Sequence, residues 1–117
     1  MSAAPILQTE LHRHLDISMR PSTLLELAQQ RGLESQGTSL PAFIDKLVIR
    51  EPMKDLDSVL ESFRICQKVL DRPEALTRIA REVCEDVHAE GTRRVELRYS
   101  PAFVSETHPP FSWDDIL

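Results

Sequence analysis

Hydrophobic and polar positions alternate in two short segments of the chain and follow helical spacing between them. The alternation in residues 5–12 and 93–101 predicts half-buried strands. Four intervening segments repeat apolar residues at the three- and four-residue spacing of amphipathic helices: residues 21–31, 39–48, 55–70 and 73–90. Because strands joined by long helical crossovers pair in parallel, the pattern predicts an α/β fold.

The predicted helices carry start and stop signals. Pro21 and Pro73 suit a first helical turn, and Ser39 can cap the helix that follows it. Gly32 and Gly91 stand where the first and the last of these helices should end. These signals support four separate helices between the two strands.

The last residues, 111–117, begin like a further helix. Ser112 and Asp115 have the spacing of a capping box. Domains rarely end one turn into a capped helix, and two parallel strands make a poor sheet by themselves. We therefore expect residues 1–117 to be a single partial domain, the N-terminal segment of a longer protein.

Composition and charge narrow the class of protein. The chain has 117 residues and a formal net charge of −5, and its basic residues are scattered, which argues against nucleic-acid binding. It has no apolar run of the roughly 20 residues that span a bilayer, which argues against membrane insertion. Its two cysteines, Cys66 and Cys84, fall on predicted apolar helix faces, so we expect reduced core residues and a cytoplasmic protein.

Two histidines near the end of the first predicted strand are the strongest candidates for chemistry. Alternation places Glu10, His12 and His14 on one face of that strand. Two neutral imidazoles aimed into one space can supply two ligands to a divalent metal, and Glu10 could orient one of them. The H-x-H pattern alone also occurs by chance and in unrelated metal hydrolases.

The sequence around this pair resembles a known family. The segments ELHRHLD (residues 10–16) and EGTRRVELRYSP (residues 90–101) are similar to the E-L-H-x-H-L-D-G and V-E-x-R-[FY]-[SA]-P patterns of the adenosine deaminase family, in the amidohydrolase superfamily. LDSVLESFRICQKVLDRPEAL (residues 56–76) resembles the crossover between those two strands. The resemblance covers nearly the whole chain.

The resemblance implies a fold and a set of site residues. It implies a (β/α)₈ TIM barrel, to which this chain contributes the first two strands and the crossover helices. His12 and His14 would ligate a catalytic Zn²⁺, and Asp16 would reach a sugar hydroxyl of a nucleoside. The matches to a helix that covers the substrate are Leu56, Val59, Leu60 and Phe63. For these four, ordinary core packing is the alternative, since a lid and a core face share one periodicity.

The resemblance also implies an activity: metal-dependent hydrolysis of adenosine or 2′-deoxyadenosine to inosine or 2′-deoxyinosine and ammonia. The remaining ligands and the general acid would come from later strands, so no catalytic residue is assigned here and the chain alone should be inactive. Ile17 replaces the glycine usual after the aspartate and keeps alternatives open: deamination of another aminopurine, such as adenine or an aminofutalosine-type compound, or a non-catalytic relative. The oligomeric state is not indicated.

Overall fold

The two predicted strands form a parallel pair. The computed structural model describes residues 8–117, apart from the side chain of Trp113. In it, β1 spans Gln8–His14 and β2 spans Thr92–Arg98, and the two pair in parallel. The start of the first predicted strand, residues 5–7, lies outside the described residues. The parallel pairing and the predicted α/β fold class are confirmed.

The helices follow the start and stop signals closely. Their bounds are α1 Pro21–Gln30, α2 Leu40–Leu47, α3 Leu56–Lys68, α4 Pro73–Ala89, α5 Pro101–Thr107 and α6 Trp113–Ile116. Gly32 and Gly91 follow α1 and α4 with φ of 69° and 94°, a region that favours glycine. The Ser39 side chain caps α2 by accepting a hydrogen bond from the Ala42 N–H.

Of the last two helices, α6 confirms a feature predicted from the sequence, whereas α5 was not predicted. The capping box is confirmed at α6, because the Ser112 N–H donates to Asp115 Oδ2 at 2.9 Å and the Asp115 N–H donates to Ser112 Oγ at 3.2 Å. The strand predicted over 93–101 ends earlier, at Arg98, and Pro101 begins α5. This helix was not predicted from the sequence.

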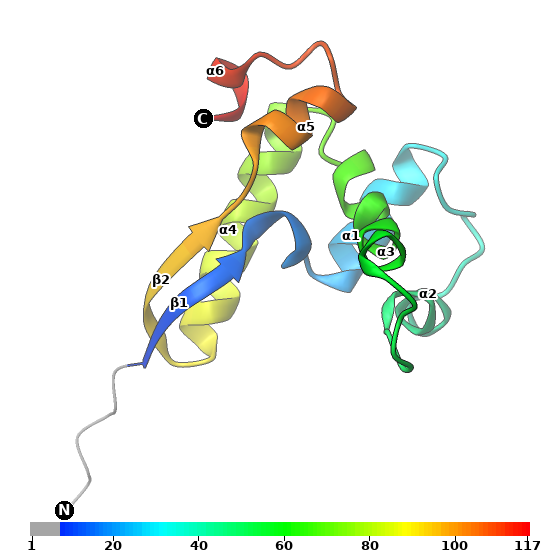
Figure 1. Ribbon diagram of the computed structural model, residues 1–117, viewed down its shortest axis with the longest axis horizontal. Helices are drawn as coiled ribbons and strands as arrows, with labels where there is room; N and C mark the ends of the chain where they lie inside the picture. The colour runs from blue at the N-terminus through cyan, green and yellow to red at the C-terminus, as the bar shows by residue number, and fades with distance from the viewer. Residues whose placement is uncertain (1–7) are drawn as a thin grey trace, which may run out of the picture.

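The strands lie against α4, and the other helices gather beyond their carboxyl ends and to one side (Figure 1). Ile79, Val83 and Val87 of α4 are buried, and Val95 and Leu97 of β2 pack against the same core. The crossover helix α4 and β2 thus share one hydrophobic core, and the short 3₁₀ turn η1 (Leu15–Ile17), directly after β1, adds Leu15 to it. β1 itself adds no apolar side chain to this core, and its Leu11 is 61% exposed, so the half-buried strand expected there is not observed in the described residues. No helix within residues 8–117 is both long enough and apolar enough to cross a bilayer.

A polar network joins the start of α1 to α4. Glu82, buried in α4, accepts hydrogen bonds from Thr23 Oγ1 at 2.7 Å and Arg78 Nε at 3.0 Å. Arg20, just before α1, donates to Asp86 at 2.7 Å. That bond outweighs partial desolvation and lowers the pKa of Asp86 below its ordinary value. The network fixes α1, and with it the turn that joins β1 to α1, against α4.

The prediction for the cysteines is half right. Cys66 is buried in α3, but Cys84 of α4 is exposed. On α4 the buried side chains include Val83 and Val87, and Cys84 lies one residue round the helix from that stripe. The expectation that Cys84 is a core residue is therefore wrong.

Candidate metal and substrate site

A bulge in β1 shapes the candidate site. Glu10 pairs with Val95 and Arg13 pairs with Leu97, so three steps along β1 oppose two steps along β2. The extra residue breaks the simple alternation of side chains between the two faces of the strand. The two-residue alternation of a regular strand therefore does not predict which face of β1 a side chain occupies when the bulge lies between it and its reference residue.

The bulge separates Glu10 from the histidines. The Glu10 carboxylate lies 3.6 Å from the Arg13 guanidinium and accepts from the His12 backbone N–H at 3.4 Å. Arg13 also donates to Glu90, at the end of α4, at 3.0 Å. The expectation that Glu10 orients an imidazole is wrong, because its carboxylate contacts Arg13 and the backbone instead.

The two imidazoles lie side by side at the carboxyl end of β1. His12 Nε2 and His14 Nε2 are 3.0 Å apart, and both side chains are exposed. Two nitrogen ligands about 2.0–2.1 Å from one tetrahedral zinc lie about 3.3–3.4 Å apart, so the pair could supply two neighbouring metal ligands with little adjustment. Within residues 8–117, no three His, Cys, Asp or Glu side chains gather closely enough to hold a metal by themselves.

The turn after β1 directs Asp16 toward the crossover helices. The buried Leu15 anchors η1 in the core, and Ser18 Oγ donates to the His14 carbonyl at 2.5 Å. Asp16 Oδ2 accepts a hydrogen bond from Gln67 Nε2 of α3 at 2.7 Å. No non-glycine residue among those described has a positive φ, so Ile17 occupies its position without the backbone strain that a glycine there would suggest.

A cavity of about 290 Å³ collects residues from four segments. It is lined by His14, Asp16 and Ile17 from the end of β1 and η1, by Leu60, Phe63, Arg64 and Gln67 of α3, and by Phe103 of α5. The lining is mainly apolar, with a few polar groups converging on it, which is the usual character of a small-molecule site. His12 does not line the cavity but contacts His14, which does.

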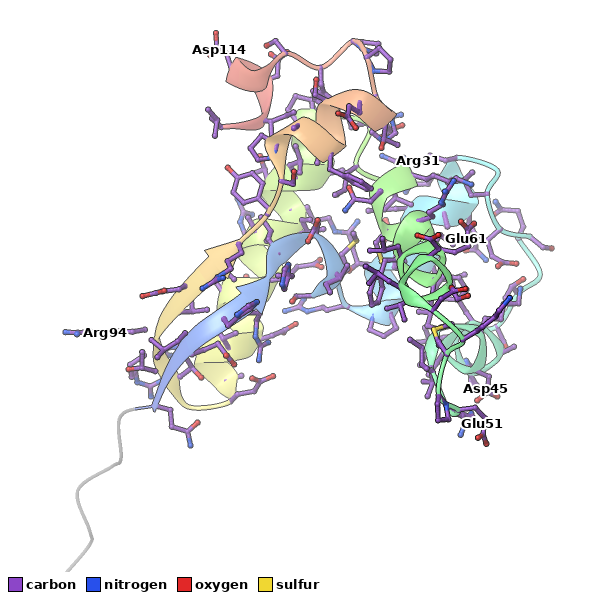
Figure 2. All side chains as sticks on the ribbon, in the orientation of Figure 1. Arg31, Asp45, Glu51, Glu61, Arg94 and Asp114 are labelled. Carbon is purple, nitrogen blue, oxygen red and sulfur yellow. The ribbon has the colours of Figure 1, made fainter. Side chains whose placement is uncertain are left out.

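The four residues of the predicted lid divide into two pairs. Leu60 and Phe63 line the cavity, whereas Leu56 and Val59 do not. Leu56 is 70% exposed and Leu60 is 51% exposed, so core packing is the wrong interpretation for both. Figure 2 labels Glu61 on α3, and within this helix the buried residues, Cys66 and Gln67, lie in its last turn. The lid role itself stays a prediction.

Three cavity residues were missed by the sequence interpretation. Gln67 interrupts the apolar stripe of α3, which is a signal that sequence reasoning could have used. Arg64 and Phe103 offered no comparable signal, because Arg64 reads as an exposed helix residue and Phe103 belongs to the unpredicted α5. Burial and the nearby Asp16 carboxylate raise the pKa of the Cys66 thiol to about 11.

Comparison with known proteins identifies one family that this chain matches. The chain matches the family model described as "Adenosine deaminase" over residues 8–116. It is 37% identical over 92 residues to an adenosine deaminase of Clostridium perfringens, covering 79% of this chain and 28% of that protein. It is 38% identical over 100 residues to an adenosine deaminase of Shigella flexneri, covering 86% of this chain and 30% of that protein. A probable adenosine deaminase of Dictyostelium discoideum is 41% identical over 99 residues, covering 80% of this chain and 12% of that protein. The chain thus spans less than a third of each of these relatives.

Proposed function

The chain belongs to the adenosine deaminase family, and on that premise we propose that it is the N-terminal segment of a zinc-dependent adenosine deaminase. The full-length protein would hydrolyse adenosine or 2′-deoxyadenosine to inosine or 2′-deoxyinosine, with release of ammonia. In this proposal the chain forms the first part of a (β/α)₈ barrel, and residues outside it complete the metal site and supply the general acid.

One observation carries the proposal: residues expected to bind metal, sugar and base converge on one cavity. His14, Asp16, Leu60 and Phe63 come from three different elements and line the same 290 Å³ space. His14 and Asp16 lie at and just beyond the carboxyl end of β1, the end at which parallel barrels build their active sites. The reaction in this proposal is taken from the family relationship, and the cavity is the site at which we propose that it takes place.

His12 and His14 would hold the zinc. Their Nε2 atoms are close enough to serve one ion, and neutral imidazole is an ordinary zinc ligand. A zinc ion held there would supply Lewis-acid activation of water. A catalytic zinc normally has three protein ligands, so the 117 residues alone are expected to be inactive.

The other cavity residues would bind and enclose the nucleoside. The Asp16 carboxylate would accept a hydrogen bond from a sugar hydroxyl, which fixes the substrate relative to His14. Leu60 and Phe63 would cover the purine with apolar surface and exclude water from it. In this proposal Leu56 and Val59 continue the same helix face outside the cavity. The proposal includes a cytoplasmic location, which the free thiols of Cys66 and Cys84 favour.

The test is zinc content and ammonia release in the full-length protein that contains this chain, with adenosine, 2′-deoxyadenosine and adenine as substrates. We expect near-stoichiometric zinc and turnover of adenosine. His12→Ala and His14→Ala should each lose zinc and turnover together. His88→Ala is the matched control, because His88 is an exposed histidine near the end of α4, remote from the cavity residues.

Two results would contradict the proposal. Full zinc retention in both His12→Ala and His14→Ala would show that the pair is not a ligand pair. Bound zinc without turnover of any adenosine would favour the second candidate, a related deaminase acting on another aminopurine. Ile17 is the observation behind that candidate, since its side chain lines the cavity beside Asp16 and takes up space that a glycine would leave open.

A further inference from the structure

Gln67 is a polar residue at an apolar position. It lies in the last turn of α3 and is only 6% exposed, between the buried Cys66 and the fully buried Val69 and Leu70. Methionine has nearly the same length and flexibility and would fill such a position without burying an amide. The amide therefore calls for an explanation other than packing.

The amide is engaged on one side only. Gln67 Nε2 donates to Asp16 Oδ2 at 2.7 Å, across 51 residues of sequence. Gln67 Oε1 is buried and, among the described residues, has no hydrogen-bond partner. Reversing the amide would turn Oε1 toward the carboxylate, so Asp16 dictates its orientation. A buried acceptor left without a partner costs free energy, which indicates that the contact with Asp16 serves something other than stability.

The Gln67 backbone is held as firmly as its side chain. Its carbonyl oxygen lies 2.9 Å from Nε2 of His108, the C-cap residue that directly follows α5, and also accepts from the Leu70 N–H at 3.1 Å. Gln67 thus connects η1, α3 and α5 around the cavity. Among the described residues, the bond from Gln67 is the one hydrogen bond that the Asp16 side chain receives, so it decides how the carboxylate is presented to the cavity.

We propose that Gln67 is a positioning residue for Asp16, and that it sets how strongly the site distinguishes substrates that carry the recognised sugar hydroxyl from those that lack it. This inference rests on the proposed function. With Oδ2 held by Gln67, the carboxylate keeps a fixed orientation in which its remaining lone pairs can meet a hydroxyl. Without Gln67 it can turn away, and the hydroxyl loses a preorganised acceptor.

The experiment measures kcat and KM of the full-length protein for adenosine and its 2′-, 3′- and 5′-deoxy analogues. In the unaltered protein, the analogue with the largest loss in kcat/KM identifies the recognised hydroxyl. We expect Gln67→Met to lower kcat/KM for adenosine about tenfold, mainly through KM, which corresponds to about 1.4 kcal/mol. The same variant should change kcat/KM for the sensitive analogue less than about twofold, because that analogue never used the hydroxyl.

Two further variants separate positioning from packing. Lys68→Met introduces the same side chain at the exposed neighbouring position and should leave the ratio of adenosine to analogue unchanged. Asp16→Ala should lower the ratio, and adding Gln67→Met to it should lower the ratio no further, since residues that act as a unit are not additive. If Gln67→Met does not fold, Gln67→Asn keeps a buried amide but withdraws it from Asp16 by one methylene group, with the same expected ratio.

The outcomes distinguish this inference from the proposed function. A folded Gln67→Met protein with an unchanged ratio of adenosine to analogue overturns the positioning role and leaves the deaminase proposal standing. A full-length protein that turns over no adenosine overturns both. A ratio that falls equally in Lys68→Met also overturns the inference, because the effect would then belong to the helix turn and not to Gln67.

Discussion

Replacing Thr23 with valine tests the network that fixes α1 against α4. Valine has nearly the same shape and a similar helix propensity, so the change removes the hydroxyl and little else. Thr23 is 2% exposed and donates to the buried Glu82 carboxylate at 2.7 Å. Hydrogen bonds to charged groups contribute about 1.5–3 kcal/mol, so we expect Thr23→Val to lower the free energy of unfolding by about 2 kcal/mol.

The charge on Glu82 provides an internal check on this magnitude. Glu82→Gln keeps an acceptor oxygen but removes the charge, and neutral hydrogen bonds are about half as strong. Thr23→Val should therefore cost only about 1 kcal/mol in the Glu82→Gln background, a coupling of about 1 kcal/mol between the two sites. Thr23→Ser removes the methyl group but keeps the hydroxyl, so as a control it should retain the coupling to Glu82.

The assay is urea unfolding of the full-length protein, with hydrogen exchange of the α1 amides as a local probe where unfolding is not two-state. A cost below about 0.5 kcal/mol for Thr23→Val, or the same cost in both backgrounds, would refute the reasoning. The first result would mean that water or another donor replaces the threonine hydroxyl at the buried carboxylate, and the second would mean that the charge of Glu82 does not strengthen the bond.

Four other predictions follow from the fold and the cavity. Phe43 is the buried side chain of α2 and 1% exposed, so Phe43→Ala should cost about 3–5 kcal/mol in urea unfolding. Ile17→Gly should enlarge the cavity beside Asp16 and raise kcat/KM for adenosine relative to adenine several-fold in steady-state assays. Hydrogen bonds from Thr38, Lys46 and the Ser35 backbone lower the pKa of Glu34 from 4.5 to about 2. Because the unfolded state then binds the proton first, the stability that Glu34 contributes should be complete above about pH 4.5 and lost as the pH falls toward 2, as acid titration of unfolding would show. Cys84 should react with an alkylating reagent at pH 8 much faster than Cys66, whose thiol has a pKa of about 11, when the labelled peptides are compared by mass spectrometry.

Each of these predictions has a result that would contradict it. Phe43→Ala at a cost below 1 kcal/mol would place α2 outside the cooperative core. An unchanged preference between adenosine and adenine in Ile17→Gly would mean that Ile17 does not determine which of the two substrates is preferred. Acid sensitivity that is identical in Glu34→Gln would assign the pH dependence to other carboxylates. Equal labelling of the two cysteines would mean that α3 opens readily.

The local parts of the fold were readable from the sequence because their signals are local. Pro21, Ser39 and Gly91 act through their own backbone geometry, so the helix ends could be predicted without knowing what packs against them. Pro101 was ambiguous, because a proline that stops a strand is also a suitable first residue of a helix. Because Ser100 was not interpreted as the cap of a helix, the predicted strand extends too far and α5 is missed.

The site depends on relations that no single segment encodes. The H-x-H pair and Asp16 could be found from their motif, but the side of the strand that Glu10 occupies depends on the register of β1 against β2, and therefore on the bulge. The bond between Asp16 and Gln67 joins positions 51 residues apart and appears only when α3 packs on η1. The motif indicates which residue types to expect at the candidate site, and packing determines their partners in the structure.

The two-stranded sheet has a practical consequence for anyone who expresses these 117 residues alone. The described chain pairs β1 with β2 only, so the outer edge of each strand keeps unpaired N–H and C=O groups. Leu11 is 61% exposed on β1, and elsewhere on the chain Leu56 and Leu60 of α3 add exposed apolar surface. Such edges recruit further strands from neighbouring molecules. In recombinant production we therefore expect the isolated chain to collect in inclusion bodies or soluble aggregates unless a fusion partner or the rest of the polypeptide covers those edges.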